Sequence, residues 1–215
     1  MEEVKADRIP LRQRQALETR NAIARAARSL FAERGYATAS IEAVAEEAGV
    51  AVRTVYSIFG TKKAILAAIC EDWLLEAGVM EDVAEGMATT DLRRRIELVA
   101  HSSRRQWESE RGVCAMLEGA AASDAEVARM LAGWKTDRAR SFHSVTTGVE
   151  GSLRPGIDGT RAGATFRALT SFQVYSELVV GEGWSPHEYE EWITGLLCDL
   201  LLPPQPSRAD DDGAR

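Results

Sequence analysis

The 215-residue sequence predicts an all-α protein, with short helices near the N-terminus and longer helices beyond residue 80. Three observations support this fold class. Apolar residues recur every three or four positions through most of the chain, which places them on one face of a helix. No segment of useful length alternates polar and apolar residues as a half-buried strand does. Glycines and N-capping residues divide the pattern into separate helices.

The first helix is expected over residues 11–34, and Gly35 follows it in the position of a left-handed C-cap residue. Its apolar face consists of Ile23, Ala26, Ala27, Leu30 and Phe31.

Two short helices come next. Ser40 is expected to cap the first of them, over residues 41–48, and Gly49 ends it. The second is expected over residues 52–59 and stops at Gly60. Thr61 then caps a fourth helix, whose first residues are lysines.

The longer helices are expected to start near residues 90, 124 and 159, with a loop over residues 151–159. The last helix has the clearest start signal. Ser185 and Glu188 form a capping box around a proline at the first helical position. Trp184 and Tyr189 are spaced to form a hydrophobic staple across this start.

The composition is that of a globular protein, with 45% apolar and 27% charged residues and a net charge of −7. No apolar run is long enough to span a membrane, and no signal peptide is visible, so a cytoplasmic protein is expected. The scattered cysteines Cys70, Cys114 and Cys198 lack a CxxC spacing, which fits a reducing compartment. Residues 1–66 hold eleven basic and eight acidic residues, whereas the rest of the chain is strongly acidic. This asymmetry favours nucleic-acid contact by the N-terminal part.

Two short helices joined by a glycine turn have the geometry of a helix-turn-helix, whose second helix enters the major groove of DNA. The crossing of these helices needs a small residue, a turn residue that tolerates positive φ, and a buried aliphatic residue. Ala45, Gly49 and Val55 have the required types and spacing.

Residues 19–66 resemble the DNA-binding domain of the TetR family of bacterial transcriptional regulators. The resemblance is carried by Thr19, Arg20, Ile23, Ala26, Ala27, Leu30, Phe31, Gly35, Tyr36, Ser40, Ile41, Ala45, Ala48, Gly49, Val50, Thr54, Tyr56, Phe59, Lys62 and Leu66. It covers under a quarter of the chain, but the order and spacing of these residues are specific.

By this resemblance, residues 51–57 face the major groove. Arg53 is the best direct reader, since a guanidinium bonds to guanine O6 and N7, and Lys62 falls on the family's phosphate-contacting lysine. The chain departs from the family at Ala51, where a capping serine is common, at Ile58, which cannot donate to a phosphate, and at Lys63, which adds a cation. The implied DNA-binding residues are Ser40, Ala51, Val52, Arg53, Thr54, Tyr56, Ser57, Lys62 and Lys63.

The resemblance also implies a division of the chain. A flexible, basic-tinged arm (1–18) that reaches an adjacent groove precedes a helix-turn-helix domain (19–67), a ligand-binding and dimerisation domain (68–202) and a disordered tail (203–215). An apolar or aromatic effector is expected to bind near Trp107, Met116, Trp134, Phe142, Phe166 and Phe172, although plain core packing is an open alternative for each. The homodimer interface is expected to include Tyr189, Trp192, Leu196 and Leu200.

The sequence offers no nucleophile elbow, phosphate-binding loop or metal-ligand spacing, so neither an enzyme, a cofactor nor a metal site is predicted. The favoured function is a homodimeric repressor that a small molecule releases from a palindromic operator in double-stranded DNA. A ligand-independent or architectural DNA-binding protein is the alternative. A helical enzyme or carrier would need a convergent polar pocket, which the sequence does not display.

Overall fold

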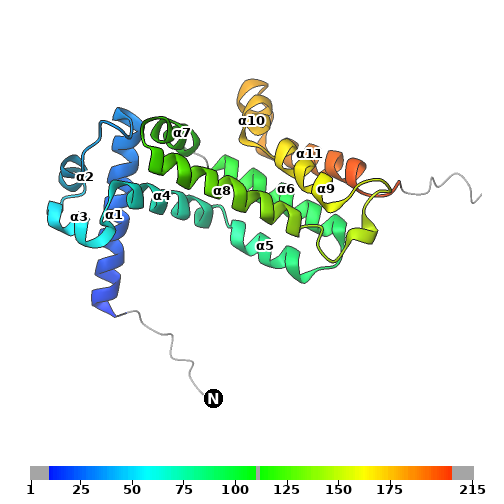
Figure 1. The fold of residues 1–215 in the computed structure, drawn as a ribbon, viewed down its shortest axis with the longest axis horizontal. Helices are drawn as coiled ribbons and strands as arrows, with labels where there is room; N and C mark the ends of the chain where they lie inside the picture. The colour runs from blue at the N-terminus through cyan, green and yellow to red at the C-terminus, as the bar shows by residue number, and fades with distance from the viewer. Residues whose placement is uncertain (1–9, 110–111, 205–215) are drawn as a thin grey trace, which may run out of the picture. The chain divides into compact units, whose positions relative to one another are not determined.

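The structure is a computed structural model that describes residues 10–109 and 112–204 (Figure 1). Helices make up most of these ranges, and no strand occurs within them. The predicted all-α class is confirmed.

The described residues divide into two compact units. The head contains residues 10–72 and 112–131, and the body contains residues 73–109 and 132–204. The head comprises α1 (Leu11–Arg34), α2 (Ile41–Glu47), α3 (Val52–Phe59), most of α4 (Lys62–Glu76), α7 (Val113–Ser123) and the start of α8 (Ala125–Ser144). The body comprises the ends of α4 and α8 together with α5 (Val79–Ala88), α6 (Leu92–Glu108), a 3-10 turn (Glu150–Ser152), α9 (Gly159–Leu169), α10 (Phe172–Tyr175), a π turn (Ser176–Gly181) and α11 (Pro186–Leu201).

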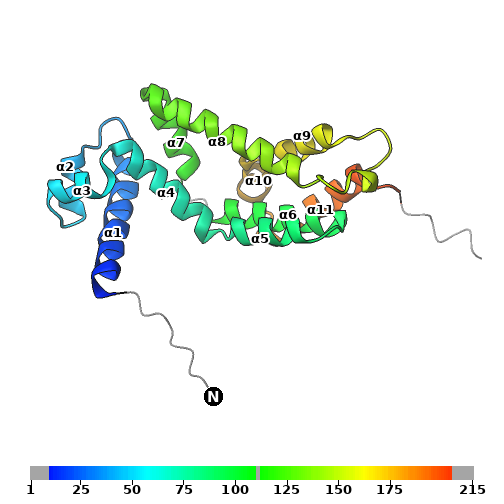
Figure 2. The same ribbon diagram turned by 60° about the horizontal axis from the view of Figure 1, so that its bottom comes forward.

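In the head, α2 and α3 lie beside α1 (Figures 1 and 2). The predicted bounds of α1 and α3 are confirmed, and α2 ends one residue before its predicted end. Each of α1, α2 and α3 has an apolar face that points into the head, because helices with apolar residues on one side can share one core. The fully buried side chains of this core include Ile23, Ala27, Val44, Ile65 and Leu66.

The start of α1 corrects the predicted N-terminal arm. Residues 11–18 are helical, and residues 1–9 lie outside the described part of the chain. The carbonyl of Pro10 accepts hydrogen bonds from the amides of Gln13 and Arg14, which begins the helix. The buried positions of α1 begin only at Ile23, so its first turns extend past the head core (Figures 1 and 2).

The unit boundaries also differ from the predicted domain limits. The division falls after residue 72 rather than residue 67, because α4 continues unbroken through the predicted limit. Residues 112–131 pack with the head although they are distant from it in sequence. Of the predicted tail, residues 203 and 204 are non-helical, and residues 205–215 lie outside the described part.

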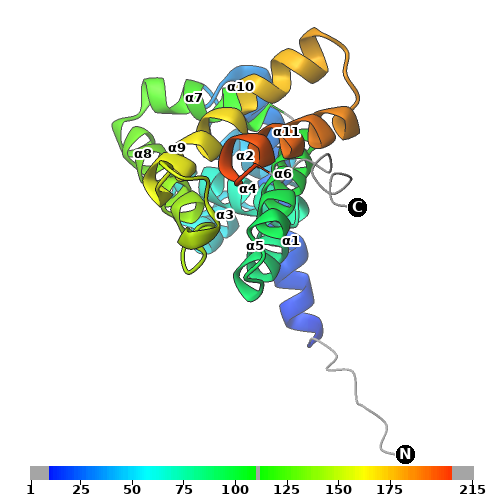
Figure 3. The same ribbon diagram turned by 90° about the vertical axis from the view of Figure 1, so that its right-hand side faces the viewer.

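In the body, α6 packs against both α5 and α11 (Figures 2 and 3). The helix predicted from residue 159 to residue 180 is interrupted at Thr170. The carbonyl of Thr170 accepts hydrogen bonds from Trp107 Nε1 at 3.0 Å and from Arg138 at 3.3 Å. These tertiary bonds replace the helical partner of that carbonyl, which explains why the sequence pattern alone missed the break.

The start of α11 confirms the predicted capping box. Glu188 N donates to Ser185 Oγ at 3.2 Å, and Ser185 N donates to the Glu188 carboxylate at 2.7 Å. The predicted staple between Trp184 and Tyr189 is replaced by another ring contact. Trp184 lies edge-on to Trp192, with ring centroids 5.8 Å apart.

Candidate nucleic-acid interface

The crossing of α2 and α3 has the geometry that a helix-turn-helix needs. Ala45 and Val55 are each 1% exposed, so the two helices meet at these side chains. Gly49 has φ of +65°, the left-handed conformation that favours glycine. The amide of Val50 donates to the carbonyl of Ala45 at 2.9 Å and closes the turn.

The outer face of α3 is exposed and polar. Burial of Val55 turns Arg53, Tyr56 and Ser57 outward, and Tyr56 is 51% exposed. Within the described ranges, the side chains of these three residues make no hydrogen bond or ion pair. They are therefore available to an external partner. Ala51 is also exposed, whereas Val52 and Thr54 are half-buried.

The two helix starts differ in capping. Ser40 Oγ accepts a hydrogen bond from Ala43 N at 3.1 Å and caps α2. Its hydroxyl proton remains able to donate to an anion. Ala51 provides no side-chain cap for α3, as its sequence predicts.

Lys62, a predicted phosphate contact, is half-buried and bonds to the main chain. Its Nζ donates to the main-chain carbonyls of Tyr36 at 2.6 Å, Ala39 at 3.0 Å and Ala37 at 3.4 Å. It also lies 4.4 Å from the centroid of the Tyr36 ring. Burial lowers the pKa of Lys62, although the charge of Asp124 opposes this. The lysine thus joins the start of α4 to the loop between α1 and α2.

Lys63 also has a partner within the head. Its Nζ forms an ion pair with the Glu126 carboxylate in the first turn of α8. The predicted phosphate contact of Lys63 would therefore have to replace this ion pair. Burial and then the carboxylate of Asp124 raise the pKa of Tyr36 to about 12. The ion pair could not be predicted from local sequence, because 63 residues separate Lys63 from Glu126.

Arg20 supports the far end of α3. Its guanidinium bonds to Asp72 at 3.3 Å and lies 3.7 Å from the carboxylate of Glu71, both on α4. The same guanidinium is 5.7 Å from the centroid of the Phe59 ring. One side chain thus connects α1, α3 and α4 and fixes the orientation of the exposed helix.

A sequence model of the bacterial regulatory proteins of the tetR family matches residues 23–69. The matched segment begins in the buried half of α1 and contains α2 and α3 in full. Residues 23–69 are therefore similar to the DNA-binding segment of TetR-family regulators. This segment holds the helix-turn-helix formed by α2 and α3.

Solved structures show the same fold over most of the chain. NalD of Pseudomonas aeruginosa, a secondary repressor of the MexAB-OprM multidrug efflux pump, has a TM-score of 0.69 at 20% identity, covering 87% of this chain and 98% of NalD. SmeT in complex with triclosan has a TM-score of 0.69 at 20% identity, covering 87% of this chain and 98% of SmeT. A protein of Saccharomonospora viridis described as a transcriptional regulator, in complex with choline, gives 0.63 at 21% identity, covering 86% and 98%. No protein of curated function matches the sequence.

Outside the helix-turn-helix, the fold brings five of the predicted effector residues into the body and leaves Met116 in the head. The ring centroids of Trp107 and Phe172 are 5.5 Å apart, and those of Phe142 and Phe166 are 6.0 Å apart. Phe166 is fully buried, and Trp107 and Phe142 are each 8% exposed. Trp134 is half-buried, and no ring pair within the described residues includes it.

The sequence prediction missed the residue that joins these rings. The Arg138 guanidinium lies 5.1 Å from the Trp107 ring centroid and 4.9 Å from that of Phe142, and it bonds to Gln106 Oε1 at 2.8 Å. Arg138 stands four residues from both Trp134 and Phe142, so helical spacing places all three on one face of α8. That spacing is the signal by which it could have been found.

The predicted dimer residues fall on two sides of α11. Tyr189 is fully buried in the body and does not reach the surface. Trp192 is 37% exposed, Leu200 is 38% exposed and Leu196 is half-buried, so these three form an outer apolar stripe. The inner face is made of Tyr189, Ile193, Leu197, Cys198 and Leu201.

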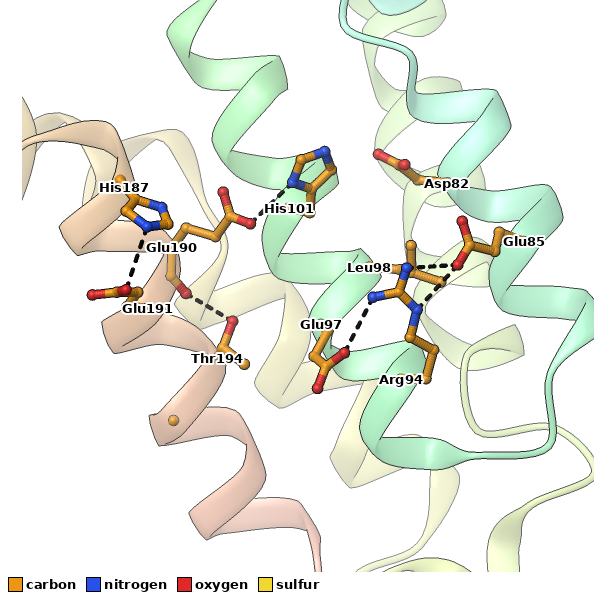
Figure 4. Close-up of a pocket in the computed structure, with 11 residues that line it drawn as sticks. Asp82, Glu85, Arg94, Glu97, Leu98, His101, His187, Glu190, Glu191 and Thr194 are labelled. Carbon is orange, nitrogen blue, oxygen red and sulfur yellow. Dashed lines mark hydrogen bonds and ion pairs between the residues drawn. The ribbon is translucent and has the colours of Figure 1, made fainter.

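The body also has an open hollow of about 680 Å³ between α5, α6 and α11 (Figure 4). Its lining is mainly charged, and most of the charges are already paired. Arg94 bonds to Glu85 at 2.6 Å, and His101 Nδ1 lies 2.9 Å from the carboxylate of Glu190. The predicted aromatic effector residues do not line this hollow.

The described ranges contain no group of three His, Cys, Asp or Glu side chains placed to hold a metal ion. None of their helices combines the length and apolar character that crossing a membrane requires.

Proposed function

We propose that this chain is a homodimeric repressor of the TetR family that binds a palindromic operator and is released from it by a small molecule. The observation that carries the DNA-binding part is the outer face of α3. Arg53, Tyr56 and Ser57 are exposed there and have no side-chain partner among residues 10–109 and 112–204, while Val55 holds the helix against α2. We infer that the protein acts in the cytoplasm, where its operator is accessible.

Each exposed residue suits a different part of DNA. The Arg53 guanidinium can donate two hydrogen bonds to guanine O6 and N7 in the major groove. Tyr56, Ser57 and the hydroxyl of Ser40 suit phosphate contacts, which set position rather than sequence preference. Half-buried Thr54 suits a phosphate or a thymine methyl group.

A homodimer follows from the outer apolar stripe of α11. Trp192 and the two leucines beside it leave apolar surface in water, and pairing with a second copy would remove it. A two-fold axis would present two α3 helices about 34–36 Å apart, which demands a palindromic site.

The effector is proposed to be apolar or aromatic, with an anionic or hydrogen-bond-accepting group. The cluster of Trp107, Phe142, Phe166 and Phe172 around Arg138 supports this class. The complexes of SmeT with triclosan and of the Saccharomonospora viridis protein with choline support a small-molecule effector in general. Operator affinity measured with and without a candidate ligand tests this part, and an unchanged affinity at saturation would count against that ligand.

The decisive experiment is selection of bound genomic fragments by the purified protein, followed by affinity measurements for Arg53→Ala over a range of salt concentrations. We expect a palindromic site, with the variant losing about 1–3 kcal/mol of binding free energy and losing preference at one base position. Ser57→Ala is the matched control on the same face, expected to weaken binding equally for all sequences.

Sequence-blind, salt-sensitive binding by the wild type would instead favour an architectural DNA-binding protein. In that case Arg53→Ala would weaken binding to every duplex by the same factor.

A further inference from the structure

Two carboxylates of α8 lie against the start of α4 within the head. The Glu126 carboxylate pairs with Lys63 Nζ, and the Asp124 carboxylate lies close enough to Tyr36 to raise the pKa of that phenol. Asp124 Oδ1 also accepts from Glu126 N at 2.8 Å and caps α8, which fixes the position of the helix start. Negative charge is therefore held beside the turn that follows the exposed face of α3.

Lys63 is the cation of this turn that can change partner. Lys62 donates to three main-chain carbonyls, two of them part-buried, and leaves them only by breaking all three bonds. Within the described residues, Lys63 bonds to the Glu126 side chain alone, and the two side chains are 37% and 60% exposed. Exchange of one exposed anionic partner for another costs little free energy.

We propose that Glu126 holds Lys63 in place of a DNA phosphate, so that this ion pair lowers the affinity of the head for duplex DNA. The proposal rests on the proposed DNA-binding function. Lys63 follows the last residue of α3 by only four positions, which places it beside the face that meets the DNA backbone.

The competing carboxylate belongs to a helix that also reaches the proposed effector residues. α8 runs unbroken from Ala125 to Ser144, so Glu126 in the head and Arg138 and Phe142 in the body share one helix. An effector that displaces α8 changes the distance between Glu126 and Lys63. The ion pair thus gives the regulator a defined charge through which effector binding alters operator affinity.

A double-mutant cycle with Glu126→Gln and Lys63→Gln tests this inference. Affinity is measured for the operator and for a non-specific duplex between about 50 and 200 mM salt, since phosphate contacts act on any sequence. Circular dichroism and thermal unfolding of each variant verify that the fold is retained. Glu118→Gln is the matched control, because it removes an exposed carboxylate of α7 from the same unit.

We expect Glu126→Gln to bind both duplexes about two- to fivefold more tightly, with a salt slope steeper by about 0.9. The gain should vanish in the Lys63→Gln background and be absent in Glu118→Gln. An unchanged affinity of Glu126→Gln, or an equal gain without Lys63, would overturn the inference. Failure of the repressor proposal can be told apart from failure of this inference. In the first case the wild type selects no operator, but the affinities of the four proteins for the non-specific duplex still test the ion pair. Binding to neither duplex would refute both.

Discussion

Arg95 is a buried cation that is held by main-chain carbonyl oxygens. It is 6% exposed, and its guanidinium donates to Thr89 O at 2.8 Å and to Val145 O and Thr147 O at 2.9 Å each. These bonds join α6 to the turn before it and to the loop after α8. Lys62 plays a similar part in the head, where its ammonium joins α4 to the loop between α1 and α2. In both cases one long side chain satisfies carbonyls that no helix can pair.

Replacement of Arg95 by methionine is expected to lower the free energy of unfolding by about 3 kcal/mol, because carbonyl oxygens lose their donors while little volume is lost. Urea unfolding at neutral pH measures the change. Arg93→Met is the control, since Arg93 is exposed on the same helix and its loss should cost less than about 0.5 kcal/mol. Equal losses in the two variants would contradict a structural role for the guanidinium of Arg95.

At the scale of one helix, α11 is joined to α6 by polar contacts as well as by its apolar inner face. The Glu190 carboxylate accepts from Arg104 Nε at 2.5 Å and lies 2.9 Å from His101 Nδ1. Burial raises the pKa of Glu190, but the hydrogen bonds from His101 and Arg104 outweigh it and hold the pKa below its ordinary value. The charged form therefore stabilises the contact between the two helices.

Glu190→Gln is expected to lower the free energy of unfolding by about 1–2 kcal/mol at pH 7. Because the folded-state pKa is depressed, this contribution is full above the unfolded-state pKa of about 4.3 and is lost as the pH falls through the lower folded value. Urea unfolding between pH 7 and acid pH should thus show the free energies of unfolding of the wild type and of Glu190→Gln converging as the pH falls. Glu191→Gln, on the exposed side of α11, is the control. A difference in free energy of unfolding that stays constant or widens at acid pH would show that the charge of Glu190 is not its source.

At the scale of the whole molecule, the outer stripe of α11 determines the expected assembly. The inner face of that helix is buried in the body core. Its apolar residues that reach the surface and could contact a second copy are Trp192, Leu196 and Leu200. Tyr189, which the sequence predicted to lie in the interface, is fully buried within one chain.

The double variant Leu196→Glu and Leu200→Glu is expected to be a folded monomer, since it places two like charges on the stripe of each protomer. Sedimentation equilibrium should report the mass of one chain instead of two, and operator affinity should fall because one half-site is lost. Leu75→Glu is a matched control at a leucine that is 63% exposed in the body. A variant that keeps the mass of two chains would place the interface elsewhere.

The sequence predicted the N-terminal helices and the start of α11 well, but it did not predict α5 or α7 and predicted contacts between distant segments poorly. The bounds of α3 and the cap at Ser185 were confirmed because each depends on neighbours within a few residues. The break at Thr170 was missed because its carbonyl is taken by Trp107, 63 residues away in the chain. Likewise, nothing local to Lys62 indicated that carbonyls more than twenty residues earlier would hold it.

By itself the sequence determined the all-α class, the helix-turn-helix and which face of α3 is buried, because apolar periodicity and capping are local properties of the chain. Only the tertiary structure decided which cations remain available to DNA. Lys62 and Lys63 stand side by side in sequence, yet one is held by main-chain carbonyls and the other by Glu126 of α8. The physical reason is that folding brings partners to a charged side chain from distant parts of the sequence, and these partners decide whether it stays available.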